Sequence, residues 1–199
     1  MKLGDYKLIF IAVGLIGVLL IATPALAEVI GVLGGEQFSE LYLLDPDHMA
    51  ENYPYNIEVG QDYSVNVGVG NNLGSLAYYV LYVKLANQTD QMPNDVLGTP
   101  SSLQPLYEYR FSIKDNMNWE RLLTFSVSNA FISGNNSQIK ILQINGDSFN
   151  VDKLAVWDSN SFSFKYRLLF ELWLYNVHTG IAEFNNRHVN LQLNLIQPT

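Results

Sequence analysis

Apolar and polar residues alternate with a period of two along most of the chain after residue 36. This is the pattern of β-strands that bury one face. The clearest case is 162–175, where aromatic and aliphatic positions alternate with a face that holds Lys165, Arg167 and Glu171. Further strands are predicted at 38–44, 55–59, 63–69, 76–85, 106–113, 121–128, 139–144, 148–151 and 189–195.

The turns between these segments favour an antiparallel arrangement. Asn145-Gly146 is a strong signal for a two-residue hairpin, and residues 178–180 turn the long strand back. Residues 87–104 hold many turn-forming residues without periodicity and are the longest predicted loop. With no convincing soluble helix, the pattern predicts an all-β, antiparallel, immunoglobulin-like β-sandwich of about seven to nine strands.

The start of the chain has a different pattern. From Leu8 to Ala27 no residue is charged, and about 20 apolar residues suffice to cross a bilayer as a helix. Lys2 and Lys7 precede this run, so the positive-inside rule places the C-terminal part outside the cell membrane. We predict a cytoplasmic N-terminus at 1–7, a single transmembrane helix or uncleaved signal anchor at 8–33, and an extracytoplasmic β-sandwich domain at 34–199.

A cleaved signal peptide is the alternative for the same run. Residues 24–27 before Glu28 form a small-x-small cleavage pattern. The apolar stretch is longer than the roughly 7 to 15 residues of a usual signal core, however, and it resumes after Glu28. We therefore favour a retained anchor.

Composition narrows the class of the exported part. The chain has 199 residues and no Cys, which excludes disulfides, thiolate catalysis and zinc bound by Cys. After the anchor it is long enough for one domain with a proper core. The formal net charge is −8 at pH 7, which argues against nucleic acid and anionic lipid surfaces as partners.

Several segments of the chain together form a pattern that is also found in a known family. They are Phe38–Leu44, Tyr53-Pro54, Ile57–Gly60, Val65–Asn72, Asn118-Trp119 and Tyr166–Leu174. These segments resemble an archaeal membrane-anchored family of unknown function, numbered sixteen-sixteen. The resemblance implies an envelope protein with an immunoglobulin-like exterior, and it assigns no catalytic residue because the family has no assigned reaction. Members often carry several membrane helices, whereas one is predicted here.

Two glycosylation sequons fit an extracytoplasmic location. They begin at Asn87 and Asn135, and both fall in predicted loops, where an acceptor Asn must lie. Because Asn is abundant in this chain, each sequon alone is weak. We predict both as candidate sites of a glycoprotein.

Sequence motifs for catalysis are not found. His48, His178 and His188 are the only histidines, and no hydrolase, metalloprotease or phosphate-loop motif accompanies them. Asp45, Asp47, His48 and Glu51 could offer ligands to a divalent cation, but their spacing matches no defined calcium loop and a turn is the preferred interpretation. Glu171 and Glu183 could form a glycosidase-type acid pair, which we do not favour. We predict no enzyme activity, no metal and no cofactor.

Aromatic and small residues suggest contact surfaces. Trp173 and Tyr175 lie on the strand face that also carries charges, so they are candidates for an interface. Gly14 and Gly17 would permit close approach of another membrane helix. The other prominent rings, among them Tyr78, Tyr82, Trp119 and Trp157, are expected in the core.

The preferred function is a non-catalytic, single-pass accessory subunit. Its β-sandwich would dock onto a larger envelope or membrane complex, such as one that assembles or N-glycosylates surface proteins. A filament or stator subunit of pilin or archaellum type is one alternative, although Asp5 and Lys7 interrupt the start of the helix. A carbohydrate-binding or carbohydrate-active envelope protein is the other, with a glycan as its partner.

Overall fold

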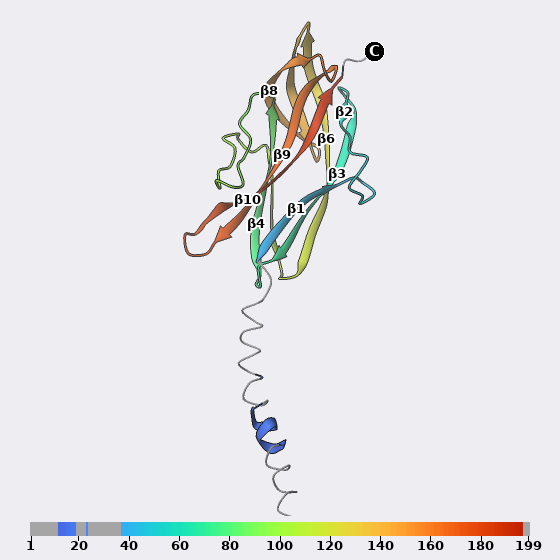
Figure 1. Cartoon of the computed structure of the whole chain (residues 1–199). Helices are drawn as coiled ribbons and strands as arrows, with labels where there is room; N and C mark the ends of the chain where they lie inside the picture. Colours follow the sequence, from blue (N-terminus) through green and yellow to red (C-terminus); the bar gives the residue numbers. More distant parts are fainter. Residues whose placement is uncertain (1–11, 19–22, 24–36, 197–199) are drawn as a thin grey trace, which may run out of the picture. The chain divides into compact units, whose positions relative to one another are not determined.

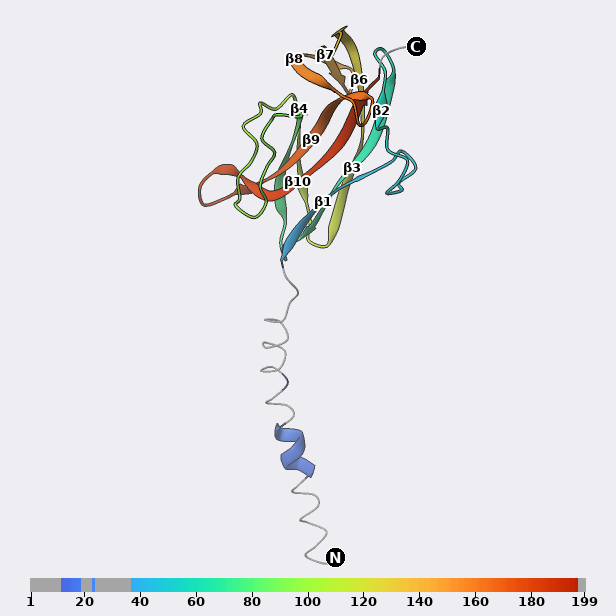
Figure 2. The same ribbon diagram turned by 45° about the horizontal axis from the view of Figure 1, so that its top comes forward.

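The computed structural model describes residues 12–18, 23 and 37–196. Most of 37–196, which we call the β domain, is in strands and the turns between them (Figures 1 and 2). The strands are β1 (Phe38–Leu44), β2 (Asn56–Ile57), β3 (Asp62–Asn72), β4 (Ala77–Asn87), β5 (Tyr107–Ile113), β6 (Met117–Ser133), β7 (Asn136–Ile144), β8 (Asp147–Asp158), β9 (Ser163–Asn176) and β10 (Ile181–Leu195).

Little of the N-terminal segment is described. Residues 12–18 form a short helix. No helix in the described part of the chain is long and apolar enough to cross a membrane. Most of the predicted span at 8–33 lies outside the described residues, as does the predicted cytoplasmic segment at 1–7. Gly14 and Gly17 lie in the short helix, and apart from the backbone of that helix no described residue lies within 4 Å of a Cβ added to either.

The β domain is one curled sheet whose two parts face each other across the core. The first part has the order β1-β3-β6-β7-β8, and the second has the order β5-β4-β9-β10-β2. β8 joins them, because Trp157 and Asp158 at its end pair with Phe164 and Ser163 of β9. Neighbouring strands are antiparallel except for β2, which runs parallel to β10.

Alternation along each strand builds the core. Val65, Val67 and Val69 of β3 point inward from the first part, and Leu81 and Val83 of β4 from the second. Burial of such side chains stabilises the fold by about 1.5–3 kcal/mol each. The most deeply buried large residues include Tyr79, Phe125, Ile139, Leu142, Phe164, Tyr166, Leu168 and Phe170.

The far face of β3 is also covered, although its residues are polar or small. Tyr42 of β1 lies across Gly68, where an added Cβ would come within 2.1 Å of the ring. Asn66 is 4% exposed, and its side-chain amide donates to the backbone carbonyl of Asp45 at 2.8 Å. The general expectation that alternating strands bury one face therefore does not hold for β3, because Asn66 and Gly68 on its other face are buried as well.

The predicted strands occur, with different ends in several cases. β1 has the predicted bounds, and Asn145 and Gly146 form the predicted hairpin turn with φ of 51° and 88°. β6 and β8 are longer than predicted, and β10 begins at Ile181 rather than at residue 189. A bulge between Phe184 and Arg187 interrupts the alternation of β10, which explains why its first half was missed.

Candidate functional site

The outer face of the second part of the sheet carries the most distinctive chemistry. Cross-strand pairing aligns its side chains in rows from β5 to β10. One row holds Ser112, Tyr78, Tyr175 and Ala182; the next holds Arg110, Val80, Trp173 and Phe184; a third holds Glu108, Tyr82, Glu171 and His188. Loop 88–106, which connects β4 to β5, crosses part of this face.

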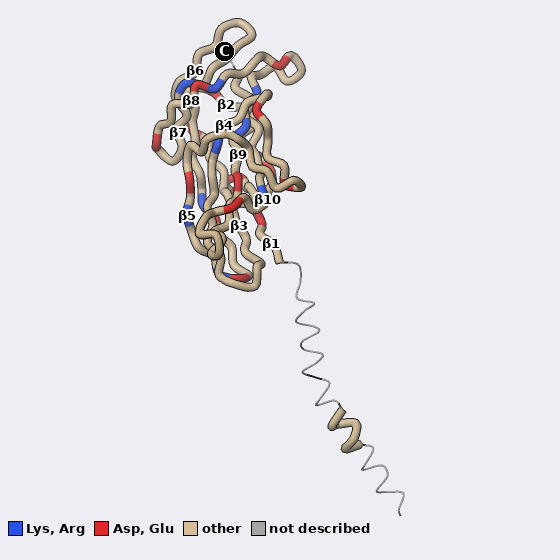
Figure 3. The backbone as a smooth tube through the Cα atoms, turned by 90° about the vertical axis from the view of Figure 1, so that its left-hand side faces the viewer, with Lys and Arg blue, Asp and Glu red and all other residues tan. Residues whose placement is uncertain are grey.

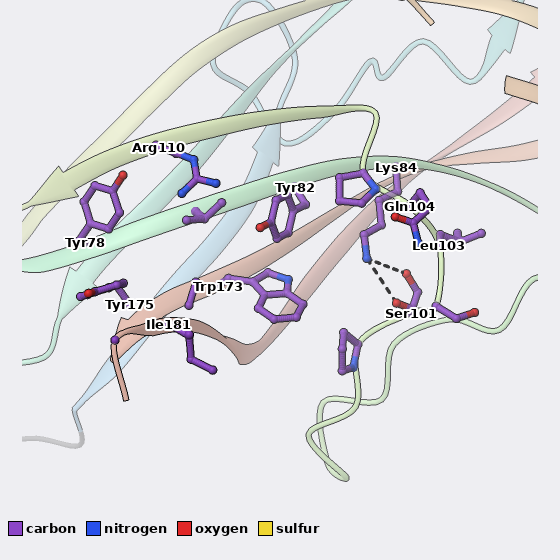
Figure 4. Close-up of a pocket in the computed structure, with 16 residues that line it drawn as sticks. Tyr78, Tyr82, Lys84, Ser101, Leu103, Gln104, Arg110, Trp173, Tyr175 and Ile181 are labelled. Atoms are coloured by element: carbon purple, nitrogen blue, oxygen red, sulfur yellow. Dashed lines mark hydrogen bonds between the residues drawn. The ribbon is translucent and has the colours of Figure 1, made fainter. Parts of the chain in front are cut away.

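The covered half of the face is the part around Lys84 and Glu171. These side chains are 3% and 0% exposed, and Lys84 Nζ lies 2.6 Å from Glu171 Oε2. Ser101 of loop 88–106 completes the cluster, because its backbone N–H and its hydroxyl donate to Glu171 Oε1 at 3.0 and 2.5 Å. Lys84 also donates to the Ser101 hydroxyl at 3.2 Å (Figure 4). The buried charges therefore have partners, as a stable buried pair requires.

An ion pair and a hydrogen bond further hold loop 88–106 along its length. Near its start, Asp90 accepts from Lys153 of β8 at 2.9 Å. At its middle, Asp95 lies 2.7 Å from Nδ1 of His188 of β10. Together with Ser101, these contacts hold the loop against β8, β9 and β10.

The open half of the face is a groove of about 690 Å³ beside the loop. This volume lies within the range of small-ligand sites. Its floor is formed by Tyr78 and Tyr82 of β4 and by Trp173 and Tyr175 of β9 (Figure 4). One wall is loop 88–106 from Pro100 to Pro105, and the other is the β9–β10 hairpin at Gly180, Ile181 and Ala182.

The rings of the floor form two pairs. Tyr78 and Tyr175 meet edge to face with centroids 6.0 Å apart, and both are exposed, by 38% and 40%. Tyr82 and Trp173 meet in the same manner at 5.5 Å. Edge-to-face pairing stabilises the rings against each other and leaves ring surface toward the groove.

Charges at the groove are compensated by neighbours. Arg110 forms a double hydrogen bond with Glu108, with Nε donating at 2.7 Å and an Nη at 3.2 Å. This contact and a hydrogen bond with Tyr78 raise the pKa of Arg110 above its already high ordinary value. Figure 3 shows acidic and basic segments close together along the strands of the β domain.

The sequence candidates for chemistry have structural roles. Asp45 is 2% exposed, and its carboxylate accepts the backbone N–H groups of Asp47 and Met49 at 3.0 and 2.8 Å, which makes it a turn residue. Among the residues that the structure describes, no group of three or more His, Cys, Asp or Glu is placed to hold a metal ion. Glu171 is committed to Lys84 and Ser101 in the interior.

Glu183 belongs to the β9–β10 hairpin rather than to an acid pair with Glu171. It accepts hydrogen bonds from Asn176 at 3.1 Å and from Thr179 at 2.8 Å. These bonds hold the pKa of Glu183 below its ordinary value. Its role is to fix the hairpin that forms one wall of the groove.

The two sequons differ in their surroundings. Asn87 ends β4, and its side-chain amide donates to the carbonyl of Leu154 at 2.8 Å, which satisfies the free edge of β8. Asn135 is exposed in the turn between β6 and β7. Glycosylation stays a prediction at both positions, and the acceptor nitrogen of Asn87 is already hydrogen-bonded.

The groove contains the predicted interface candidates Trp173 and Tyr175 and adds residues that the sequence did not single out. Tyr78 and Tyr82 were expected in the core, which is wrong, because Tyr79 occupies the core instead. Apart from Lys84, both faces of β4 are apolar or aromatic from Ala77 to Ala86, so the positions of the aromatic residues do not reveal which side points inward. Arg110 and the loop residues Ser102 and Gln104 were missed because only the tertiary fold brings them to the groove.

These observations define a small all-β domain with an open aromatic groove. The chain belongs to the DUF1616 family, a domain of unknown function, whose model matches residues 33–155. This confirms the family that the sequence segments resemble. Tyr78, Tyr82 and Arg110 lie inside the matched region, and Trp173 and Tyr175 lie beyond it. No curated protein matches the chain.

Similar solved structures are distant. A β-glucosidase from Listeria innocua has 9% identity and a TM-score of 0.38 over 82% of this chain, which covers 17% of the enzyme. The CARDB domain of a Pyrococcus furiosus protein, in complex with di-metal ions, has 12% identity and a TM-score of 0.38 over 82% of this chain and 99% of that domain. A β-glucuronidase from Bacteroides uniformis has 9% identity and a TM-score of 0.35 over 78% of this chain and 13% of that enzyme. Likenesses at this level assign neither a fold nor an activity.

Proposed function

We propose that this protein is a non-catalytic, single-pass membrane subunit of the cell envelope, whose immunoglobulin-like β domain docks onto a larger complex through the aromatic groove. The observation that carries the proposal is the open floor of Tyr78, Tyr82, Trp173 and Tyr175. Aromatic residues are enriched at the centres of interfaces because they bury much area at a low cost in side-chain entropy.

The surroundings of the groove favour binding over catalysis. The described residues that line it include no carboxylate and no histidine. Glu171, the partner of the lining residue Lys84, is buried and paired with that cation, so it is a poor candidate for proton transfer to a ligand. A scaffold that fixes its loop by buried charges and leaves rings open suits a rigid binding surface.

The membrane part of the proposal rests on the amino-acid sequence. The uncharged run from Leu8 to Ala27 is long enough to span a bilayer, and Lys2 and Lys7 favour a cytoplasmic start. An anchor holds the β domain near membrane partners and raises their effective concentration. Because the partner is held nearby, a groove that buries little area can still support a stable complex.

The test is purification of the full-length chain from its own membranes in mild detergent, with mass spectrometry of the intact chain and of copurifying proteins. We expect an intact mass that includes residues 1–33 and a stoichiometric partner. Tyr175→Ala and Trp173→Ala should each remove the partner. Phe131→Ala is the matched control, because Phe131 is 62% exposed on β6, outside the groove.

Two results would contradict this function. One is a partner that remains bound at the same stoichiometry in both groove variants while each variant keeps its far-UV circular dichroism spectrum. The other is a wild-type chain that purifies without any stoichiometric partner. An intact mass that corresponds to a chain starting at Glu28 would show that the apolar segment is cleaved, and the membrane anchor would then be dropped from the proposal.

A further inference from the structure

We propose that the groove binds a neutral glycan. This inference rests on the proposed function, since it names the chemistry that the docking groove recognises. It depends on the arrangement of the rings, on the pairing of the charges and on the absence of a free strand edge at the floor.

The rings provide the apolar part of a sugar site. A sugar ring has a face of C–H groups and an edge of hydroxyls, so it stacks on an aromatic face while its hydroxyls reach polar neighbours. Tyr78 and Tyr82 are four residues apart on β4, roughly 13 Å along the strand, and Trp173 and Tyr175 are two residues apart on β9, roughly 7 Å. The centres of the two ring pairs are therefore roughly 10 Å apart. That span suits an oligosaccharide better than a single sugar.

The margins of the groove provide the polar part. Ser102 and Gln104 line the loop wall, and both are exposed. With the Tyr78 and Tyr82 hydroxyls on the floor, these groups can donate to sugar hydroxyls and accept from them. Sites of this kind combine a mainly apolar lining with a few polar groups that fix orientation.

The pairing of charges favours a neutral ligand. Lys84 is compensated by Glu171 at 2.6 Å, and Arg110 by the two oxygens of Glu108. Among the described residues that line the groove, neither cation is therefore left uncompensated for an acidic polymer, and none is an acid that could attract a basic one. The formal net charge of −8 further disfavours acidic ligands.

The same geometry disfavours a peptide. β4 is paired with β5 and β9, and β9 is paired with β4 and β10, so the floor has no free edge for an added strand. The indole N–H of Trp173 donates to Glu171 Oε2 at 3.4 Å, which leaves it engaged rather than directed at a peptide carbonyl. What the floor offers is ring surface.

The groove is suited to hold a glycan without cutting it. Glycoside hydrolysis generally needs two carboxyl groups on either side of the scissile bond. No described residue that lines the groove is Asp or Glu. The inferred role is recognition of a glycan on a surface polymer or on the partner itself.

The test uses the full-length chain in detergent and three immobilised probes. These are the neutral and the acidic oligosaccharide fractions released from the envelope of the source cells, and a proline-rich peptide. We expect saturable binding of the neutral fraction that is unchanged by added salt. Tyr175→Ala should weaken it about tenfold, as loss of one ring contact does, and Phe131→Ala should leave it unchanged.

The results that would overturn the inference are distinct from failure of the docking proposal. Preference for the acidic fraction or for the peptide, equal binding by wild type and Tyr175→Ala, or no binding of the neutral fraction each contradicts a glycan site. If a stoichiometric partner is still lost from Tyr175→Ala in those cases, docking through the groove stands and only the glycan is excluded. Where the neutral fraction does bind, deglycosylation of the partner distinguishes a partner-borne glycan, whose removal abolishes binding, from an envelope polymer.

Discussion

The covered and open halves of the outer face use neighbouring positions on β4 and β9 in opposite ways. In the covered half, Lys84 and Glu171 lie under loop 88–106 with nearly no exposed surface. In the open half, Tyr78 and Tyr175 on the same two strands keep 38% and 40% of their surface exposed. Charges that are buried must be fully paired, whereas aromatic rings tolerate both burial and water.

This difference assigns separate roles to the two halves. The covered half fixes the position of loop 88–106, and through it the wall of the groove from Pro100 to Pro105. The open half contributes little to the stability of the fold, and it presents its rings to a ligand. Substitutions in the first half should therefore act on folding, and those in the second should act on binding.

The largest effect is expected from Lys84→Met. It leaves the Glu171 carboxylate buried without its cation, which destabilises a fold by about 3–5 kcal/mol. Urea unfolding of the full-length chain measures this. Lys140→Met is the matched control, because Lys140 pairs with Asp152 in water, at 42% and 64% exposure, where a pair contributes about 0–1 kcal/mol. Equal losses in the two variants would contradict the account of the covered half.

Ser101→Ala should have the next largest effect. It removes the hydroxyl that donates to Glu171 at 2.5 Å but keeps the backbone N–H contact. Loss of a hydrogen bond to a charged group costs about 1.5–3 kcal/mol. Hydrogen exchange in loop 88–106 should accelerate as well. Ser102→Ala, on the exposed neighbouring residue, should change neither the free energy of unfolding nor the exchange rate of the loop. A similar effect in that variant would show that Ser101 is not the residue that holds the loop in place.

Tyr175→Ala should separate binding from stability. The side chain is 40% exposed, and its ring meets that of Tyr78 edge to face, so we expect a loss of at most about 1 kcal/mol in unfolding free energy. Partner binding should nevertheless be lost. Isothermal titration and urea unfolding on the same preparation give both numbers. A large loss of stability with intact binding would reverse the roles of the two halves.

The smallest expected effect is the pH dependence of the β9–β10 hairpin, which comes from the titration of Glu183. Hydrogen bonds from Asn176 and Thr179 hold the pKa of Glu183 below its ordinary value of 4.5. A depressed carboxyl pKa contributes stability that is present above the unfolded value and is lost as pH falls through the folded value. The Gly180 amide resonance should therefore shift with a midpoint below 4.5. Glu183→Gln should abolish this titration, and a midpoint above 4.5 would contradict the hydrogen-bonded arrangement.

Local patterns predicted the strands well where one face is buried and the turn is short. β1 and the Asn145-Gly146 hairpin follow directly from alternation and turn chemistry. Alternation failed at the bulge between Phe184 and Arg187, because one irregularity reverses which positions point inward. It also failed on β4, where Tyr78 and Tyr79 give no preference for either face.

The site was only partly predictable for a related reason. Trp173 and Tyr175 stood out because they share a face with charged residues of β9. Glu171 was expected on that solvated face, yet it is 0% exposed. Glu171 is covered by Ser101, which is 70 positions away in the chain. Such long-range contacts leave no trace in a local pattern, so the walls of the groove could not be derived from periodicity.

The central claim is that the open half is the surface that meets the partner. Photo-crosslinking in intact cells tests it directly, with a photoreactive phenylalanine analogue placed at Tyr175 in one strain and at Phe131 in another. We expect one specific adduct from position 175 and none from position 131, because only the first lies in the groove. The same adducts from both positions, or an adduct from position 131 alone, would contradict the claim.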